Sequence, residues 1–381
     1  MHDVYYAAVD DYSDAELDAA LEKSLLPCVK SLGGLNGKRV MIKPNFLEWK
    51  GHEHPVCVAP ELLVALCRFL KRGGAAEVAV IENPAVRTAP VIVEKMGIAS
   101  ELDALDVTVA NCADYQLTDM AADSVYRKIE VAQEFRNYDL VIDFAKAKTH
   151  AMMTLTLAVK NLFGLVRGSE RLGWHLAVGR DYGQFADMLL DIYSLVMPRI
   201  SIIDAVVGME GNGPGSGTPV KLGFIACAND ALSLDASVAE KLGVPDLLVI
   251  KRAEMRGMET RFNDRGDIPD VRSIVLPDPP QMALEWGVYF PRRLREFLRR
   301  HMVAKPELDH DKCIGCGVCV KMCPPHSLKL VNGKAVFKLS ECIRCFCCQE
   351  HCPRGAITSR KTALMRFADG FEKLVRKLNR G

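Results

Sequence analysis

Nine cysteines gather in two short runs near the carboxyl end of this 381-residue chain. The first run, CIGCGVCVKMCP, supplies Cys313, Cys316, Cys319 and Cys323. The second run, CIRCFCCQEHCP, supplies Cys342, Cys345, Cys348 and Cys352, together with a fifth cysteine, Cys347. Without Cys347, both runs have the spacing C-x2-C-x2-C-x3-C-P. In a chain with no export signal, such closely spaced cysteines indicate metal ligands rather than disulfides.

The spacing of both runs resembles that of bacterial ferredoxins with two [4Fe–4S] clusters. In such ferredoxins, three cysteines of one run and the last cysteine of the other run hold each cluster. The resemblance implies that one cluster is held by Cys313, Cys316, Cys319 and Cys352. It implies that the second cluster is held by Cys342, Cys345, Cys348 and Cys323.

A pair of zinc knuckles is the alternative reading of these cysteines. Zinc sites usually join two C-x2-C units across a longer gap or include histidine, which fits two matched runs poorly. Between the runs, SLKLVNGKAVFKLS alternates apolar and polar residues around Asn332-Gly333, which predicts a β-hairpin. We therefore expect a small α+β ferredoxin-like domain over residues 306–360. Within it, we expect Cys347 to pack against a cluster or to face solvent.

The rest of the chain has an ordinary globular composition, with 49% hydrophobic and 25% charged residues. The net charge of +1 creates no overall field that would favour nucleic acid, and no nucleic-acid partner is expected. Residues 291–305 carry a net charge of +5 and residues 361–381 a net charge of +4, so the basic character is local. Without a signal-peptide pattern or an apolar run of membrane-spanning length, we expect a cytoplasmic protein.

Two basic segments flank the expected ferredoxin domain. Residues 284–305 have the pattern of a connecting helix, and residues 361–381 have apolar side chains at helical spacing opposite Lys and Arg. We expect the second helix to pack its apolar face on the ferredoxin domain. A dock for an acidic redox partner protein, such as a ferredoxin, is the alternative, and contact with an anionic membrane surface is compatible but not favoured.

Residues 1–283 alternate continuous apolar runs with helical patterns, which predicts an α/β domain with a mainly parallel sheet. The strand-like runs cover residues 3–10, 38–45, 77–83, 139–146, 199–206 and 222–229. Ser13 and Glu16 form a capping-box pattern ahead of one helix, and Pro60 stands at the expected first position of another.

Polar side chains occur where several of these strands end. They are Lys43, Asn45, Glu82, Asn83, Lys146, Lys148, His150, Asp204, Asn229 and Asp230. In open α/β sheets, ligands bind in the crevice outside the carboxyl ends of the strands. Lysines that converge there would suit an anionic ligand, either a carboxylate or a phosphate. A single lysine past a strand is more often solvated, so the prediction depends on the recurrence.

Two further features lie close to these strand ends in the sequence. Lys160 and Asn161 occur within TLTLAVKNLFGLV, where a buried lysine must be paired, reach outward or serve a ligand. The glycine-rich segment 208–219 follows the Asp204 strand, and the backbone N–H groups of Gly211 and Gly213 could approach an anion. The segment matches neither a dinucleotide fingerprint nor a P-loop, and a mobile surface loop is the alternative.

Three stretches resemble the domain-of-unknown-function family 362. They are MIKPNF, FAKAKTHAMMTLTLAVKNLFGLV, and IDAVVGMEGNGPGSGTP with CANDALSLDA. The resemblance covers roughly residues 1–280, and family members often carry a C-terminal two-cluster ferredoxin unit. It implies one site that contains Lys43, Asn45, Lys146, Lys148, His150, Lys160, Asn161, Asp204 and Glu210. It implies no reaction.

These patterns favour an iron–sulfur reductase that passes single electrons through two [4Fe–4S] clusters to an anionic substrate or cofactor in a lysine-rich crevice. His150 is the leading proton donor because histidine ordinarily titrates near neutrality, and Lys148 and Glu210 are the other catalytic candidates. The substrate is expected to bind to the other polar residues of that site and to two glycines. They are Lys43, Asn45, Lys146, Lys160, Asn161, Asp204, Gly211 and Gly213. The alternative is a non-catalytic electron carrier or assembly factor whose α/β domain binds a partner protein. The sequence neither supports nor excludes a flavin.

Overall fold

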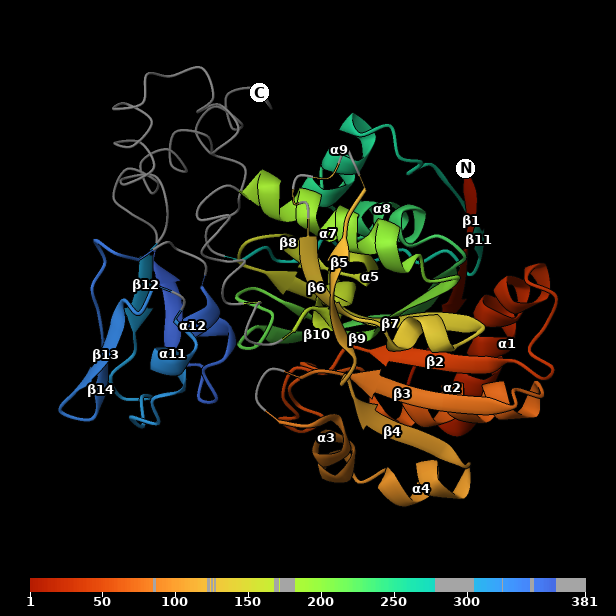
Figure 1. Ribbon diagram of the computed structural model, residues 1–381, viewed down its shortest axis with the longest axis horizontal. Helices are drawn as coiled ribbons and strands as arrows, with labels where there is room; N and C mark the ends of the chain where they lie inside the picture. The colour runs from red at the N-terminus through yellow and green to blue at the C-terminus, as the bar shows by residue number, and fades with distance from the viewer. Residues whose placement is uncertain are drawn as a thin grey trace.

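The computed structural model shows a large α/β domain with a small C-terminal domain beside it (Figure 1). It describes residues 1–84, 87–121, 124, 126, 128–167, 171, 182–277, 305–323, 325–342 and 346–360. The connecting helix predicted at 284–305, except for its last residue, and the helix predicted at 361–381 lie outside the described residues. None of the described helices is long and apolar enough to cross a membrane.

A mixed sheet of nine described strands forms the centre of the large domain. Its order is β11-β1-β10-β9-β7-β2-β3-β4, with β8 paired to β7. The strands are β1 (His2–Ala8), β2 (Arg39–Pro44), β3 (Glu77–Glu82), β4 (Val107–Asn111), β7 (Leu140–His150), β8 (Thr154–Thr156), β9 (Ile200–Glu210), β10 (Thr218–Ala228) and β11 (Phe262–Gly266). The run β9-β7-β2-β3-β4 is parallel, whereas β10 is antiparallel to both of its neighbours. The predicted α/β class with a mainly parallel sheet is confirmed.

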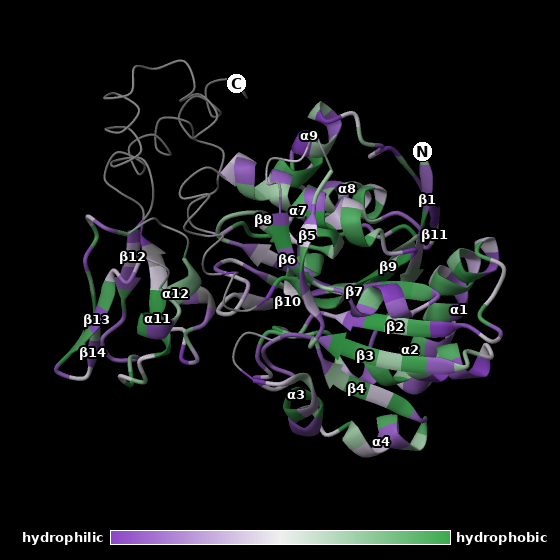
Figure 2. Cartoon of the chain, in the orientation of Figure 1, coloured by the Kyte–Doolittle hydropathy of each residue, from purple (hydrophilic) through white to green (hydrophobic). Residues whose placement is uncertain are grey.

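The apolar central strands are buried because helices cover both faces of the sheet. In β2, Val40 and Ile42 belong to one apolar core and Met41 belongs to the other. Figure 2 shows β2 and β3 largely in the hydrophobic colour. The first core includes residues of α1 (Asp14–Ser31), α2 (Pro60–Arg72), α3 (Ala89–Met96) and α4 (Ala99–Ala104). The second includes residues of α5 (Ala158–Asn161), η2 (Leu162–Leu165), α7 (Tyr182–Val196), α8 (Ala231–Lys241), α9 (Leu248–Met255), the hairpin β5 (Tyr115–Asp119) and β6 (Lys128–Ala132), and η1 (Glu134–Asn137).

The two predicted helix starts have different outcomes. Pro60 is the first residue of α2, as expected. Ser13 is the N-cap of α1, but its side chain makes no capping hydrogen bond. Glu16 instead accepts a hydrogen bond from the backbone N–H of Asp10 at 3.0 Å. The predicted capping box is therefore wrong, although the helix begins at the expected place.

Strand β7 extends further than the predicted strand at 139–146. Its last residues pair with β8, with Lys148 opposite Thr156 and His150 opposite Thr154. Lys148 and His150 are therefore part of the strand rather than of a loop after it. Because side chains alternate along a strand, Lys146 and Lys148 lie on the side opposite the buried Ala147. This extended end of β7 holds the polar residues at fixed positions.

The described residues of the C-terminal domain form two strand pairs and two short helices. They are β12 (Lys305–Leu308) with β15 (Ile357–Arg360), β13 (Leu328–Val331) with β14 (Lys334–Phe337), α11 (Val318–Lys321) and α12 (Cys347–Glu350). The predicted hairpin joins β13 to β14 through Asn332 and Gly333, whose φ angles are 49° and 72°. Asn-Gly is the dipeptide that adopts these angles most readily.

Candidate functional site

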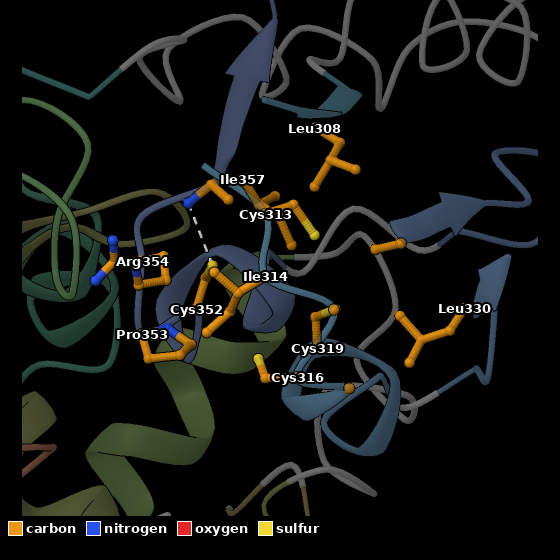
Figure 3. A pocket seen from close by; sticks show the side chains of 14 residues that line it. Leu308, Cys313, Ile314, Cys316, Cys319, Leu330, Cys352, Pro353, Arg354 and Ile357 are labelled. Carbon is orange, nitrogen blue, oxygen red and sulfur yellow. Dashed lines mark hydrogen bonds between the residues drawn. The ribbon is translucent and has the colours of Figure 1, made fainter. Parts of the chain in front are cut away.

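Four cysteines from both runs line one hollow in the C-terminal domain (Figure 3). They are Cys313, Cys316, Cys319 and Cys352, the set that the ferredoxin resemblance assigns to one cluster. The other lining side chains are mostly apolar and include Leu308, Ile314, Leu330, Ala335, Ala356 and Ile357. Four cysteine ligands within an apolar wall fit the requirements of a [4Fe–4S] cluster.

The second set of cysteines is described in part. Cys323, Cys342 and Cys348 are buried, whereas Cys345 lies outside the described residues. Cys323 and Cys348 share one small apolar core with Cys319 and Cys352, so both sets belong to one compact unit. No three described His, Cys, Asp or Glu side chains are gathered to hold a single metal ion. A cubane, by contrast, spreads its four thiolates over four irons.

The last cysteine of each run accepts an equivalent hydrogen bond. The backbone N–H of Ser327 donates to Cys323 Sγ at 3.3 Å, and that of Ala356 donates to Cys352 Sγ at 3.2 Å. The Cys323 sulfur also has a hydroxyl group close to it, since Ser327 Oγ lies 3.3 Å away. A thiolate ligand carries no proton, so the hydroxyl must be the donor. Hydrogen bonds to ligand sulfurs stabilise the more negative, reduced state and so influence the reduction potential.

Cys347, the surplus cysteine of the second run, is buried in the core of the large domain. It is 1% exposed and belongs to the apolar core that contains residues of β7 and α7. Its neighbour Cys348 belongs to the small core of the C-terminal domain. The expectation that Cys347 faces solvent is wrong, and it packs with the large domain because α12 lies against that domain.

The side chains of Gln349 and Lys50 extend this contact between the domains through hydrogen bonds. Gln349 Nε2 in α12 donates to the carbonyl of Asn212 at 3.3 Å. Lys50 Nζ donates to the carbonyl of Gly215 at 2.8 Å and to that of Cys352 at 3.4 Å. Asn212 and Gly215 belong to the glycine-rich segment after β9, so this segment is the surface on which α12 docks.

Lys43 and Glu82 form a buried ion pair at the carboxyl ends of β2 and β3. Their side chains are 1% and 2% exposed, and Lys43 Nζ donates to Glu82 Oε2. A Cβ atom at Gly164 would lie 2.5 Å from Glu82 Oε1 and 2.7 Å from Lys43 Nζ. Glycine at this position of the NLFG motif therefore leaves room for the pair, a role that the sequence did not reveal.

Asn161 joins strands β2 and β7 through its side-chain amide. Its Oδ1 accepts from Lys43 Nζ at 3.1 Å and from Asn45 Nδ2 at 3.0 Å. Its Nδ2 donates to Asp143 Oδ1 at 2.7 Å. Burial raises the pKa of Asp143 well above its usual range, against the opposing effects of Lys43 and Asn161. The structure therefore brings Lys43, Asn45 and Asn161 together, and it adds Asp143, which no motif had singled out.

Lys146 and Asp204 form the second buried ion pair of the sheet edge. Lys146 Nζ donates to Asp204 Oδ2 at 2.7 Å and to Tyr12 Oη at 3.0 Å. Tyr12 Oη donates to Asp204 Oδ1 at 2.9 Å, and the backbone N–H of Ala59 donates to Asp204 Oδ2 at 2.9 Å. Tyr12 was missed because it lies far from the strand-end motifs in sequence and has no distinctive spacing.

Lys148 lies between these groups and the segment after β2. Its Nζ donates to Asn45 Oδ1 at 2.6 Å and to the carbonyl of Val56 at 2.6 Å, and the side chain is buried. Lys160 on α5 is only half-buried. Lys43, Lys146 and Lys148 are thus close to one sheet edge, and two of them have carboxylate partners there.

His150 has a defined orientation at the end of β7. Its Nδ1 accepts hydrogen bonds from the backbone N–H groups of Met152 at 3.1 Å and Met153 at 3.2 Å. Because Nδ1 acts as an acceptor, the neutral ring must carry its proton on Nε2. The ring is 2% exposed. His150 is therefore positioned as a neutral N–H donor through Nε2.

Glu210 and the glycine-rich segment are tied to the last part of the large domain. Glu210 accepts two hydrogen bonds from Arg272, at 2.7 and 2.8 Å, and one from the backbone N–H of Val275. The hydrogen bonds from Arg272 and Val275 lower the pKa of Glu210. The backbone N–H of Gly211 donates to the carbonyl of Val275, and that of Gly213 donates to the carbonyl of Gly211. The predicted anion contacts of these two glycines therefore compete with hydrogen bonds within the protein.

Comparison with known proteins identifies both parts of the chain. A family model described as "Domain of unknown function (DUF362)" matches residues 40–240, and a "4Fe-4S dicluster domain" model matches residues 305–353. Both resemblances inferred from the sequence motifs are confirmed. The C-terminal domain is an iron–sulfur domain for two [4Fe–4S] clusters, and it supports electron transfer.

The chain is also similar to individual proteins over parts of its length. The chain is 31% identical over 229 residues to the thylakoid-associated protein sll1697 of Synechocystis sp., covering 58% of this chain and 70% of that protein. It is 40% identical over 57 residues to a ferredoxin of Pyrobaculum islandicum, covering 15% of this chain and 53% of the ferredoxin. Among solved structures, the lactate racemase apoprotein of Thermoanaerobacterium thermosaccharolyticum superposes with a TM-score of 0.41 at 14% identity, over 62% of this chain and 56% of that one.

Glu82→Gln should lower the free energy of unfolding by about 3–5 kcal/mol, because it leaves the Lys43 ammonium buried without its counter-charge. Glu77→Gln is the matched control on the same strand, since Glu77 pairs with Arg39 at the surface. That substitution should cost about 1 kcal/mol or less. Anaerobic guanidinium unfolding followed by circular dichroism measures both. Equal, small losses would show that the buried pair contributes little.

Ser327→Ala should lower the reduction potential of the cluster that Cys323 holds and leave the other potential unchanged. The substitution removes the hydroxyl donor and keeps the backbone N–H donor to the sulfur. Ala356→Ser introduces a hydroxyl at the equivalent position beside Cys352 and should shift the other cluster upward. Redox titration monitored by electron paramagnetic resonance resolves the two centres. Unchanged potentials in the Ser327→Ala variant would contradict the assignment of this donor.

Proposed function

The chain belongs to the DUF362 family, and we propose that it is a reductase whose C-terminal domain supplies single electrons to an anionic substrate or cofactor at the carboxyl edge of the sheet. When bound, the two [4Fe–4S] clusters provide one-electron chemistry. The observation that carries the proposal is the docking of α12 on the glycine-rich segment after β9. This contact brings the cysteine-bearing helix against the segment that packs on the end of β7.

A continuous set of contacts leads from α12 towards His150. Gln349 donates to the carbonyl of Asn212, and the next residue, Gly213, is in close contact with Thr149. A Cβ atom at Gly213 would lie only 2.2 Å from the carbonyl oxygen of Thr149. Thr149 is the residue before His150 in β7. Packed contacts of this kind keep the distance for electron transfer short.

Lys148, Asn45 and Lys160 are assigned to binding the anion. Lys43 and Lys146, each of which has a buried carboxylate partner, are assigned to holding the strand ends in place. A buried ammonium group that already has hydrogen-bonding neighbours can exchange one of them for an anionic oxygen at low cost in desolvation. Lys148 and Asn45 are hydrogen-bonded to each other, and both can replace this bond with a hydrogen bond to the anion.

His150 is assigned to stabilise the substrate, as it gains electrons and negative charge, through a hydrogen bond donated by Nε2. Its Nδ1 is occupied by two backbone N–H groups, which fixes the ring and leaves the opposite nitrogen as the donor. Glu210, a second acid–base candidate in the sequence, holds the docking segment through Arg272 and has a positioning role. The assignment leaves one hydrogen-bond donor and one group of anion ligands at the same sheet edge.

The test is the reoxidation of reduced protein by its own bound small molecules. Anaerobically purified protein is reduced with dithionite, desalted and mixed with the heat-released small-molecule fraction of the same preparation. The cluster absorbance should recover, and a reduced product should be detected by mass spectrometry. His150→Ala should slow this recovery by about a hundredfold or more, because it removes the Nε2 hydrogen-bond donor to the charge that develops on the substrate.

Lys148→Ala should raise the concentration of the small-molecule fraction that is needed for half-maximal reoxidation, because it removes a side chain that binds the anion. His52→Ala is the control, since the side chain of His52 is 64% exposed on the large domain. The proposal fails if His150→Ala and Lys148→Ala both match this control in rate and in ligand affinity.

A non-catalytic electron carrier or assembly factor is the second candidate function. The observation that favours it is the pairing of Lys43 with Glu82 and of Lys146 with Asp204, which neutralises two of the predicted anion-binding lysines. In that case the large domain would recognise a partner protein. Reduced protein that is reoxidised by a protein fraction but by no small-molecule fraction would support this candidate over the reductase.

A further inference from the structure

We propose that Lys50 of the large domain raises the reduction potential of the cluster assigned to Cys313, Cys316, Cys319 and Cys352. The lysine makes this cluster easier to reduce while the two domains are in contact. The inference concerns the cluster itself, so it does not depend on the substrate of the proposed reductase.

Lys50 lies in the loop that joins β2 to α2, at the contact between the domains. Its Nζ donates to the carbonyl of Gly215 at 2.8 Å and to that of Cys352 at 3.4 Å, and the side chain is half-buried. Gly215 belongs to the large domain, whereas Cys352 lines the hollow of the C-terminal domain. The large domain therefore holds an ammonium group against a residue that is assigned as a cluster ligand.

The charge of Lys50 has no carboxylate partner within ion-pair distance in the described part of the chain. Both of its hydrogen-bond acceptors are neutral carbonyl groups. Lys43 and Lys146, by contrast, each pair with a buried carboxylate. A positive charge without such a partner, in partly buried surroundings, acts on its neighbours more strongly than a fully solvated one, because less water screens it.

A positive charge favours the reduced form of a nearby cluster. Reduction adds one negative charge to the cluster and its thiolates, so an ammonium group beside a ligand stabilises the reduced state more than the oxidised state. Charge and solvent exposure are among the factors that set the potential of iron–sulfur clusters. The side chains that line the hollow are mostly apolar, which limits the screening of this attraction by water.

Two further cations lie near the same cluster site. Lys334 Nζ donates to the carbonyl of Cys313 at 2.6 Å, and Arg354 lines the hollow. Both belong to the C-terminal domain, so they accompany the cluster whether or not the domains are in contact. Lys50 differs from them because the large domain supplies it. Its effect on the potential is therefore linked to docking.

This linkage works in both directions. If contact with the large domain raises the potential, reduction of the cluster must strengthen the contact by the same free energy. The loop that carries Lys50 is also anchored at the sheet edge. The carbonyl of Val56 accepts from Lys148 Nζ at 2.6 Å, and the backbone N–H of Val58 donates to the carbonyl of Asn45 at 3.2 Å. One loop thus contacts a residue of the cluster site and two residues assigned to anion binding.

The test is a redox titration of the cluster-loaded full chain, monitored by electron paramagnetic resonance. Lys50→Met removes the charge and keeps a long, unbranched side chain. At a fixed potential, the ratio of reduced to oxidised cluster should fall by about threefold or more at the Cys352 cluster, which corresponds to about 30 mV for one electron. The potential of the other cluster should change less. Lys50→Arg keeps a permanent positive charge and should retain the potential of the unchanged protein.

Lys30→Met is the matched control, because Lys30 is an exposed lysine on α1. Figure 1 shows α1 on the side of the large domain away from the C-terminal domain. This variant should leave both potentials unchanged. Cys323→Ser alters a ligand of the other cluster, so the signal that it leaves unchanged belongs to the Cys352 cluster. Small-angle X-ray scattering and iron content establish that the Lys50 variants remain docked and loaded.

Three results would overturn the proposal. One is a docked Lys50→Met variant with both potentials unchanged, or with the larger shift at the cluster that Cys323→Ser alters. A second is an equal shift in Lys50→Arg or in Lys30→Met, which would indicate an effect of side-chain shape or of overall charge. The third is a larger radius of gyration in Lys50→Met, which would show that Lys50 holds the domains together instead of tuning a docked cluster.

Discussion

The contact between α12 and the segment after β9 determines how the two halves of this protein can work together. Cys347 packs in the core of the large domain, while Cys348, the next residue, packs in the core of the C-terminal domain. One short helix therefore couples the cores of both domains, and Gln349 and Lys50 add polar contacts on either side of it. Because burial of apolar surface is the main source of such attachment, the domains are held together by more than a flexible connection.

The sheet edge beneath this contact is organised by the cost of burying charge. Lys43 and Lys146 are almost completely buried, and a carboxylate from a neighbouring strand accompanies each of them. Asn161 links the first pair to Asn45, and Tyr12 completes the second. Asn45 also accepts a hydrogen bond from Lys148, which sets the orientation of that lysine, whereas the backbone N–H groups of Met152 and Met153 orient His150. Lys148, an assigned anion ligand, therefore belongs to the same hydrogen-bonded group as Lys43 and Asn161.

Local patterns in the sequence made much of the fold and of the candidate site predictable. The spacing of eight cysteines identified the cluster-binding domain, and continuous apolar runs identified the central strands, because both signals lie within short segments. The strand-end rule also placed Lys43, Asn45, Lys146 and Asp204 at one edge. It could not reveal which lysines have carboxylate partners, since Glu82 and Asp204 come from other strands. The burial of Cys347 and the pairing of Glu210 with Arg272 depend on tertiary packing, so no spacing rule could anticipate them.

The packing of α12 against the large domain is tested most directly by placing a charge in this contact. The measurement is small-angle X-ray scattering of the cluster-loaded full chain. Cys347→Asp buries a carboxylate in the apolar core, which should release the C-terminal domain and increase the radius of gyration. Cys347→Ala keeps an apolar side chain and should scatter like the unchanged protein. A Cys347→Asp variant with a full complement of iron and an unchanged radius of gyration would contradict the arrangement.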